Sequence, residues 1–141
     1  SKYGQGFATM EYLAASLLDM DYHVLKDVPE DMDLVQFERQ TLVDRGLLSQ
    51  IPPRYRTTYF NHTMGGGYTA GYYSYMWAEV LEADAFEAYK ETGDIFNQEV
   101  ARKFRQYILT PGGIDDAMDM YVNFRGKKPS IEPLLNNRGL K

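Results

Sequence analysis

Residues able to bind or polarise a ligand are concentrated between positions 55 and 77 of this 141-residue chain. Eight of its twenty aromatic residues lie there, together with His62 and the triple glycine Gly65–Gly67. A buried tyrosine must satisfy its hydroxyl, which makes a cluster of tyrosines costly as packing alone. A glycine-rich backbone beside hydroxyls and an imidazole is typical of a loop that closes over a ligand. Core packing explains aromatic clusters as well, so the pattern by itself leaves both interpretations open.

The same sequence lacks the common sets of catalytic residues. It has no cysteine and two histidines, so it cannot build a thiolate nucleophile or a metal site made mainly of imidazoles. Neither an H-E-x-x-H pair nor a G-x-S-x-G elbow is present. Residues 65–70 match a relaxed dinucleotide fingerprint, but no predicted strand precedes them, and no P-loop lysine follows. If the chain belongs to an enzyme, the reacting group therefore lies outside it.

Helices are expected to position the aromatic segment. Apolar residues at helical spacing predict helices over about residues 8–26, 34–45, 71–91, 98–110 and 115–124. Asp33 and Asn97 are the expected N-caps, and Gly46 and Gly126 are expected at helix ends. Residues 47–70 are predicted as a loop, and residues 129–141 as a tail with an apolar patch. Strand-like alternation is nearly absent, so the fold is predicted to be all-α.

Composition limits the partners of the chain. A length of 141 residues with 44% hydrophobic residues suits one soluble domain. The net charge of −5 argues against nucleic acid or an anionic membrane as a partner. No apolar run approaches the roughly 18 residues of a spanning helix. The sequence starts at Ser1 with neither an initiator methionine nor a signal peptide, so we expect a piece of a longer protein.

One segment carries a specific family resemblance. Residues 60–77 read FNHTMGGGYTAGYYSYMW, and they closely resemble the thimet oligopeptidase family of zinc metallopeptidases, most of all its bacterial peptidyl-dipeptidases. Further similar stretches are YGQGFATMEYLAA at 3–15, PPRYR at 52–56, FRGK at 124–127 and NRGL at 137–140. The resemblance covers nearly the whole chain.

The resemblance implies a C-terminal part of a large, two-lobed, channelled and almost wholly helical enzyme. In the family, two histidines of an H-E-x-x-H helix and a later glutamate hold zinc, and all of them lie upstream of the region matched here. The resemblance therefore implies zinc in the full-length parent and none bound by this fragment. Residues 1–141 would form the C-terminal part of the catalytic domain, with a substrate-binding loop at about 60–77, and would be inactive alone.

The resemblance also implies roles for individual residues. Tyr75 falls on the position of an oxyanion donor and His62 on that of a contact to the substrate backbone. Tyr68 and Tyr72 would orient the peptide, and they share the substrate-binding positions with Gly65, Gly66 and Gly67. The three glycines would let the loop approach the substrate. Arg54 and Arg56, beside the loop, are our candidates for binding the C-terminal carboxylate of a peptide, with Arg54 placed first, although a surface ion pair is the more common role of an arginine.

The leading hypothesis is thus the substrate-binding and transition-state-stabilising part of a peptidase that releases dipeptides from oligopeptide C-termini. Two alternatives remain open at this point: an oligopeptidase that cuts internally in short peptides, and a non-catalytic helical peptide-binding module. The expected partners are an oligopeptide and the N-terminal part of the same chain. The fragment is expected to self-associate through exposed apolar surface, and family resemblance favours the cytoplasm over the periplasm.

Overall fold

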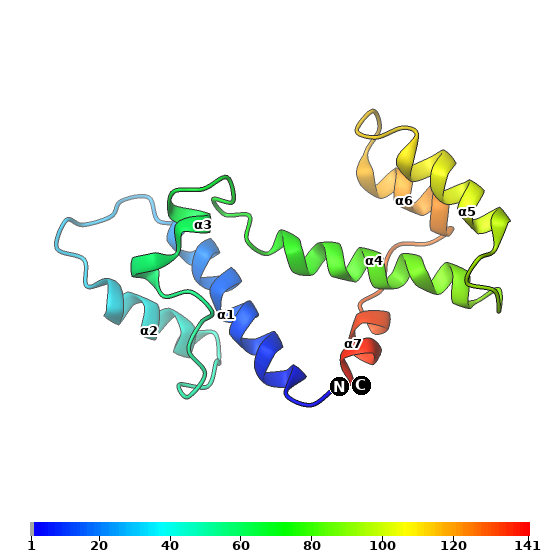
Figure 1. Ribbon diagram of the computed structural model, residues 1–141. Helices are drawn as coiled ribbons and strands as arrows, with labels where there is room; N and C mark the ends of the chain where they lie inside the picture. Colours follow the sequence, from blue (N-terminus) through cyan, green and yellow to red (C-terminus); the bar gives the residue numbers. More distant parts are fainter. Residues whose placement is uncertain (1) are drawn as a thin grey trace. The chain divides into compact units, whose positions relative to one another are not determined.

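The computed structural model describes residues 2–141, which contain helices and no strand. The all-α prediction is therefore confirmed for the described part of the chain (Figure 1). The elements in chain order are α1 Gln5–His23, α2 Leu34–Asp44, the 3₁₀ turn η1 Thr57–Tyr59, α3 Asn61–Met64, α4 Ser74–Lys90, α5 Gln98–Phe104, the π-helical turn η2 Arg105–Leu109, α6 Ala117–Arg125 and α7 Glu132–Arg138.

The helix ends follow the capping chemistry of the sequence. Asp33 accepts hydrogen bonds from the backbone N–H groups of the first turn of α2, and Asn97 does the same for α5, as predicted. Asp116 caps α6 in the same way. Gly46 follows α2 with a φ of 76°, and Gly126 ends α6 with a φ of 78°, both in the left-handed region that favours glycine.

Several helices differ from their predicted bounds: α1 spans Gln5–His23 where residues 8–26 are predicted, and α6 spans Ala117–Arg125 where residues 115–124 are predicted. The helix predicted from residue 71 begins at Ser74, because the N–H groups of Ala70 and Tyr72 donate to Asp19 of α1 instead of to a helical neighbour. The last predicted turn of the helix over 98–110 is π-helical. The sequence did not predict the short helices α3 and α7, which lie in the segments expected as a loop and a tail.

The chain divides into two compact units, one ending at Tyr75 and one from Met76 to Lys141, where its length alone suggested one domain. In the first unit, α1 packs against α2 around a core of small and branched residues: Ala14, Leu18, Leu42 and Leu47. The buried carboxylate of Glu38 on α2 accepts hydrogen bonds from the backbone N–H and the hydroxyl of Thr57, both at 2.9 Å, and pairs with Arg56. This contact fixes the segment that leads into α3.

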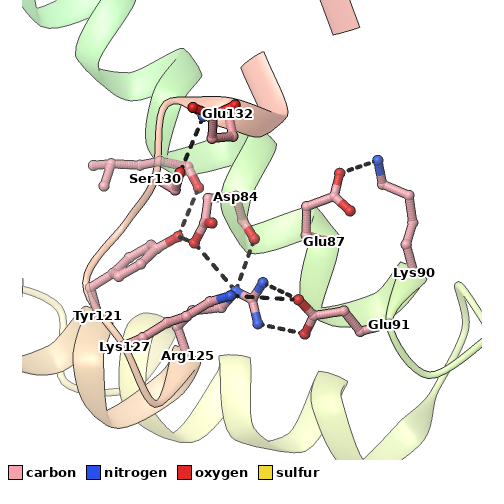
Figure 2. A network of polar contacts seen from close by, with 10 residues as sticks. Asp84, Glu87, Lys90, Glu91, Tyr121, Arg125, Lys127, Ser130 and Glu132 are labelled. Atoms are coloured by element: carbon pink, nitrogen blue, oxygen red, sulfur yellow. Dashed lines mark hydrogen bonds and ion pairs between the residues drawn. The ribbon is translucent and has the colours of Figure 1, made fainter. Parts of the chain in front are cut away.

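The second unit packs α6 against α4 and α5. Phe124 on α6 is buried, with its ring 5.3 Å from that of Phe104 on α5. Figure 2 shows the polar network that joins α6 to α4. Arg125 donates from Nε to the Asp84 carboxylate at 3.3 Å, and its two terminal nitrogens each lie 2.7 Å from a Glu91 oxygen. The Tyr121 hydroxyl donates to Asp84 at 2.7 Å.

Candidate functional site

The candidate site lies in the first unit, where the loop between α3 and α4 carries the predicted residues. His62 belongs to α3, Tyr68 and Tyr72 lie in the loop, and Tyr75 lies in the first turn of α4. Helix α1 lies against this loop, since its Tyr12 ring stacks on the Tyr72 ring with a centroid distance of 5.0 Å. The structure thus brings four predicted site residues together around one loop.

Tyr72 is the centre of this group of rings. Its ring centroid lies 5.8 Å from those of both His62 and Tyr75. The Tyr68 ring completes the group, at 5.9 Å from His62 and 5.1 Å from Tyr75. These spacings are those of favourable edge-to-face and offset aromatic pairs. We call His62, Tyr68, Tyr72 and Tyr75 the ring cluster.

The members of the ring cluster differ in exposure. The Tyr68 and Tyr75 side chains are each 40% exposed, and His62 is half-buried. Tyr72 is 3% exposed, and it packs against Tyr55 and Phe60 on its inner side. Tyr72 therefore forms the buried base on which the other rings pack, whereas Tyr68 and Tyr75 are partly exposed to solvent.

The Tyr72 and Tyr75 hydroxyls stay protonated at neutral pH. A side-chain hydrogen bond with Tyr68, assisted by partial desolvation, raises the pKa of Tyr75 to about 12. Burial raises the pKa of Tyr72 to about 12 as well. A protonated phenol is a hydrogen-bond donor, so Tyr75 can donate to an oxygen that develops negative charge.

Tyr72 reaches its place through a turn rather than a helix. A helix that starts at residue 71 would place Tyr72 and Tyr75 on one face, but α4 begins two residues after Tyr72. The Tyr72 backbone is held on both sides by α1: its N–H donates to Asp19 at 2.9 Å, and its carbonyl accepts from the Tyr12 hydroxyl at 2.6 Å. The two rings meet all the same, because the turn places Tyr72 beneath the first turn of α4.

The three glycines are not equivalent. A Cβ added to Gly66 would lie 2.7 Å from the backbone oxygen of His62, which is closer than real Cβ contacts allow. At Gly65 the nearest atom, at 2.8 Å, belongs to the flexible side chain of Asn61, and at Gly67 nothing lies within 4 Å. Gly66 is therefore required by close backbone packing against α3, while Gly67 leaves open space beside the loop.

Arg54 is the more available of the two arginines that precede the loop. Its side chain is exposed, with the guanidinium 5.8 Å from the centroid of the Tyr55 ring, and its backbone N–H donates to the Glu11 carbonyl at 3.1 Å. Arg56 is instead paired with the buried carboxylate of Glu38. The structure thus leaves the Arg54 guanidinium beside the aromatic group.

Sequence reasoning missed Asp19, which lies under the loop in α1. Its side chain is fully buried and accepts hydrogen bonds from the Thr63 hydroxyl, the Ala70 N–H at 3.0 Å and the Tyr72 N–H. His23 lies one turn later in α1, with Nδ1 2.9 Å from the same carboxylate. A carboxylate within an apolar helix was the available signal, although its partners 44 to 53 residues away were not visible.

The described residues do not assemble a metal site, since no group of three or more histidine, cysteine or acidic side chains converges in residues 2–141. Within the same residues, no helix combines the length and the apolar character needed to cross a membrane.

Comparisons with known proteins identify the family of the chain. Residues 1–140 match the family described as Peptidase family M3. Dipeptidyl carboxypeptidase of Escherichia coli (strain K12) is 41% identical over 141 residues, which cover 99% of this chain and 21% of that protein. Oligopeptidase A of the same organism is 48% identical over 82 residues, 58% of this chain and 12% of that protein. Saccharolysin of Saccharomyces cerevisiae is 32% identical over 136 residues, 94% of this chain and 18% of that protein.

The chain spans about a fifth of the length of the curated relatives that it matches from end to end. The family match extends over both compact units, and it includes the loop with the ring cluster. The resemblance stated from the sequence is thereby confirmed, and the chain belongs to peptidase family M3.

Proposed function

We propose that this chain is the C-terminal, substrate-binding part of a zinc metallopeptidase that releases dipeptides from the C-termini of oligopeptides. The ring cluster carries the proposal, because it combines two exposed phenols and an imidazole on a buried aromatic base. Such a surface offers several donors within one loop to a peptide backbone. Membership of a peptidase family makes a peptide the expected ligand.

Each residue of the cluster has a distinct role in this proposal. Tyr75 donates its hydroxyl to the oxyanion that forms when the scissile carbonyl becomes tetrahedral. Tyr68, whose ring centroid lies 5.1 Å from that of Tyr75, contacts the peptide beside it. His62 binds the substrate backbone, and Tyr72 orients these groups from below. Gly65–Gly67 let the peptide approach the loop backbone.

Zinc in the complete enzyme would be held by residues outside this chain. The described residues do not fit a metal site, because no set of three suitable side chains converges among them. The contribution of this chain is binding, orientation and hydrogen-bond donation. We therefore expect the chain by itself to be inactive and to need the N-terminal part of the same protein.

The exposed Arg54 guanidinium supports the release of dipeptides from a free C-terminus. Such an enzyme must recognise a carboxylate two residues beyond the bond it cuts, and a guanidinium binds carboxylates in a bidentate geometry. The alternative is internal cleavage of short peptides, favoured by the higher identity to oligopeptidase A over 82 residues. Substrates with a free or an amidated C-terminus separate the two modes, because only the first mode requires the carboxylate.

The test is peptide cleavage by the complete protein, with products identified by mass spectrometry. We expect dipeptides from the free-acid peptide, and slow cleavage of the amide. Tyr75→Phe should lower kcat roughly 100- to 1,000-fold, as removal of an oxyanion donor does. Tyr73→Phe is the matched control, since Tyr73 lies in the same loop, is 51% exposed, and lies outside the ring cluster. Equal activity of the two variants would contradict the role of Tyr75, and a complete protein without peptidase activity would favour a binding module.

The remaining expectations concern surface and compartment. Several large apolar side chains of the second unit are well exposed, namely Ile95, Phe96, Leu109 and Ile114. We propose that the rest of the complete protein covers them and that the isolated chain self-associates, which light scattering of the isolated chain tests. We keep the cytoplasm as the proposed compartment, with an oligopeptide as the substrate and with neither nucleic acid nor membrane as a partner.

A further inference from the structure

Asp19 is the most buried acidic residue of the first unit, and its partners belong to the functional loop. The carboxylate accepts from the Thr63 hydroxyl at the end of α3 and from the N–H groups of Ala70 and Tyr72. His23 adds a contact of 2.9 Å from its own helix. One side chain of α1 therefore accepts hydrogen bonds from three residues of the segment 63–72.

The loop conformation depends on such an anchor. Ala70 has a φ of 51°, a left-handed conformation that non-glycine residues adopt at a cost and that persists only where the surroundings impose it. The Ala70 N–H donates to one oxygen of the Asp19 carboxylate, and the Tyr72 N–H donates to the other oxygen at 2.9 Å. Hydrogen bonds from N–H groups to a buried carboxylate are stronger than neutral ones. The carboxylate thus stabilises the strained turn.

The conformation of this turn also determines the geometry of the ring cluster. Tyr72 is fixed through its N–H by Asp19 and through its carbonyl by Tyr12, so its ring has a defined place at the base of the cluster. His62 and Tyr75 both rest against that ring. A displacement of the Tyr72 backbone would therefore move the two groups to which the proposed function assigns hydrogen-bond donation.

We propose that Asp19 is a positioning residue for the peptidase reaction, which holds Tyr72 and through it the His62 and Tyr75 donors in the geometry for catalysis. The proposal rests on the proposed function, since it presupposes that the ring cluster binds the reacting peptide. Asp19 itself is buried, and it acts only through the loop.

The test is Asp19→Asn in the complete protein. Asparagine has the same size, but its NH₂ group would face an N–H group that now donates a hydrogen bond to the carboxylate. We expect kcat to fall roughly 10- to 100-fold, as when an outer-shell support is removed, with a much smaller change in KM. A phosphinic peptide, whose tetrahedral phosphinate imitates the oxyanion, should lose affinity by the same factor as kcat/KM.

Two further sets of variants separate positioning from folding. Thr63→Val removes one donor to Asp19 at constant size and should lower kcat by a smaller factor, and Thr63→Ser should restore it. Asp84→Asn removes the buried carboxylate of the second unit, and it should lower the melting temperature while the folded enzyme keeps the kcat of the wild type. Hydrogen exchange of loop amides should rise in Asp19→Asn, with the amides of α4 unaffected beyond its first turn.

The outcomes distinguish the positioning role of Asp19 from the proposed function of the ring cluster, on which it rests. The positioning role is overturned if Asp19→Asn keeps the wild-type kcat and phosphinate affinity while Tyr75→Phe loses both. It is also overturned if kcat of Asp19→Asn recovers fully once the unfolded fraction is subtracted. If Tyr75→Phe and Asp19→Asn are both fully active, the proposed function of the ring cluster is itself wrong.

Discussion

Each compact unit of the chain contains a buried aspartate, and the two carboxylates have different kinds of partner. Asp84 in the second unit meets the guanidinium of Arg125 and the hydroxyl of Tyr121, both on α6. The Asp19 carboxylate in the first unit instead contacts two backbone N–H groups, a threonine hydroxyl and a histidine. The two residues are almost equally inaccessible, with exposures of 0% for Asp19 and 1% for Asp84.

The difference separates what each carboxylate stabilises. Asp84 joins two helices through side chains, so its energy goes into the packing of the second unit. Asp19 joins a helix to the backbone of a loop, and the loop conformation that results is one the chain would not adopt by local preference. A buried ion pair thus marks a structural junction here, while a buried carboxylate on N–H groups marks the turn that carries the candidate site.

The largest effect on stability is expected from Arg125→Met. The change leaves Asp84 buried without its cation, which typically costs about 3–5 kcal/mol. Native-state hydrogen exchange of α4 and α6 amides in the complete protein measures this free energy of opening. Lys90→Met, which breaks an exposed pair with Glu87 on the same helix, is the control and should cost less than about 1 kcal/mol. A loss of kcat with unchanged exchange would place Arg125 in the catalytic machinery and end the contrast.

A smaller effect, with a different signature, is expected from Gly66→Ala in the first unit. The new Cβ meets the His62 carbonyl at 2.7 Å, so the loop must shift, at a cost of about 1–3 kcal/mol. Because His62 moves with it, kcat should fall even where the protein is fully folded. Gly67→Ala is the matched control, with open space around the added methyl and an expected change within about 0.5 kcal/mol. Equal kinetics of the two variants would show that the loop tolerates displacement.

The sequence predicted the features that depend on near neighbours. The caps at Asp33 and Asn97 and the glycine after α6 need only residues within one turn, and all three are observed. Apolar residues at helical spacing predicted the main helices for the same reason. The family resemblance identified the members of the ring cluster, because the motif at 60–77 is specific.

The rest could not be read from local patterns. Asp19 acts on Ala70 and Tyr72, which lie 51 and 53 residues away, and no spacing rule connects them. For the same reason the start of α4 was placed too early, since helical periodicity continues through Tyr72 while its N–H is held elsewhere. Nor does a motif reveal exposure: Tyr72 and Tyr75 look alike in the sequence, yet one is the buried base and the other is open to solvent.

The smallest expected effect tests whether the half-exposed ion pair between Arg125 and Glu91 contributes to stability. The hydrogen bonds from Arg125 lower the pKa of Glu91, so the ionised carboxylate favours the folded state. This contribution is complete above the ordinary glutamate pKa of about 4.5 and is lost as the pH falls through the lowered value. Because the Glu91 side chain is half-exposed, Glu91→Gln should cost less than about 1 kcal/mol at pH 7.

The measurement is the stability difference between wild type and Glu91→Gln as a function of pH. It should shrink towards zero under acid, and it should disappear at every pH in an Arg125→Met background, because the partner is then gone. A difference that persists in that background would mean that Glu91 acts through another cation, for which Lys127, at 3.7 Å, is the candidate. In that case Glu91 would stabilise the second unit independently of Arg125, and the contrast with Asp19 would rest on the pair of Arg125 and Asp84.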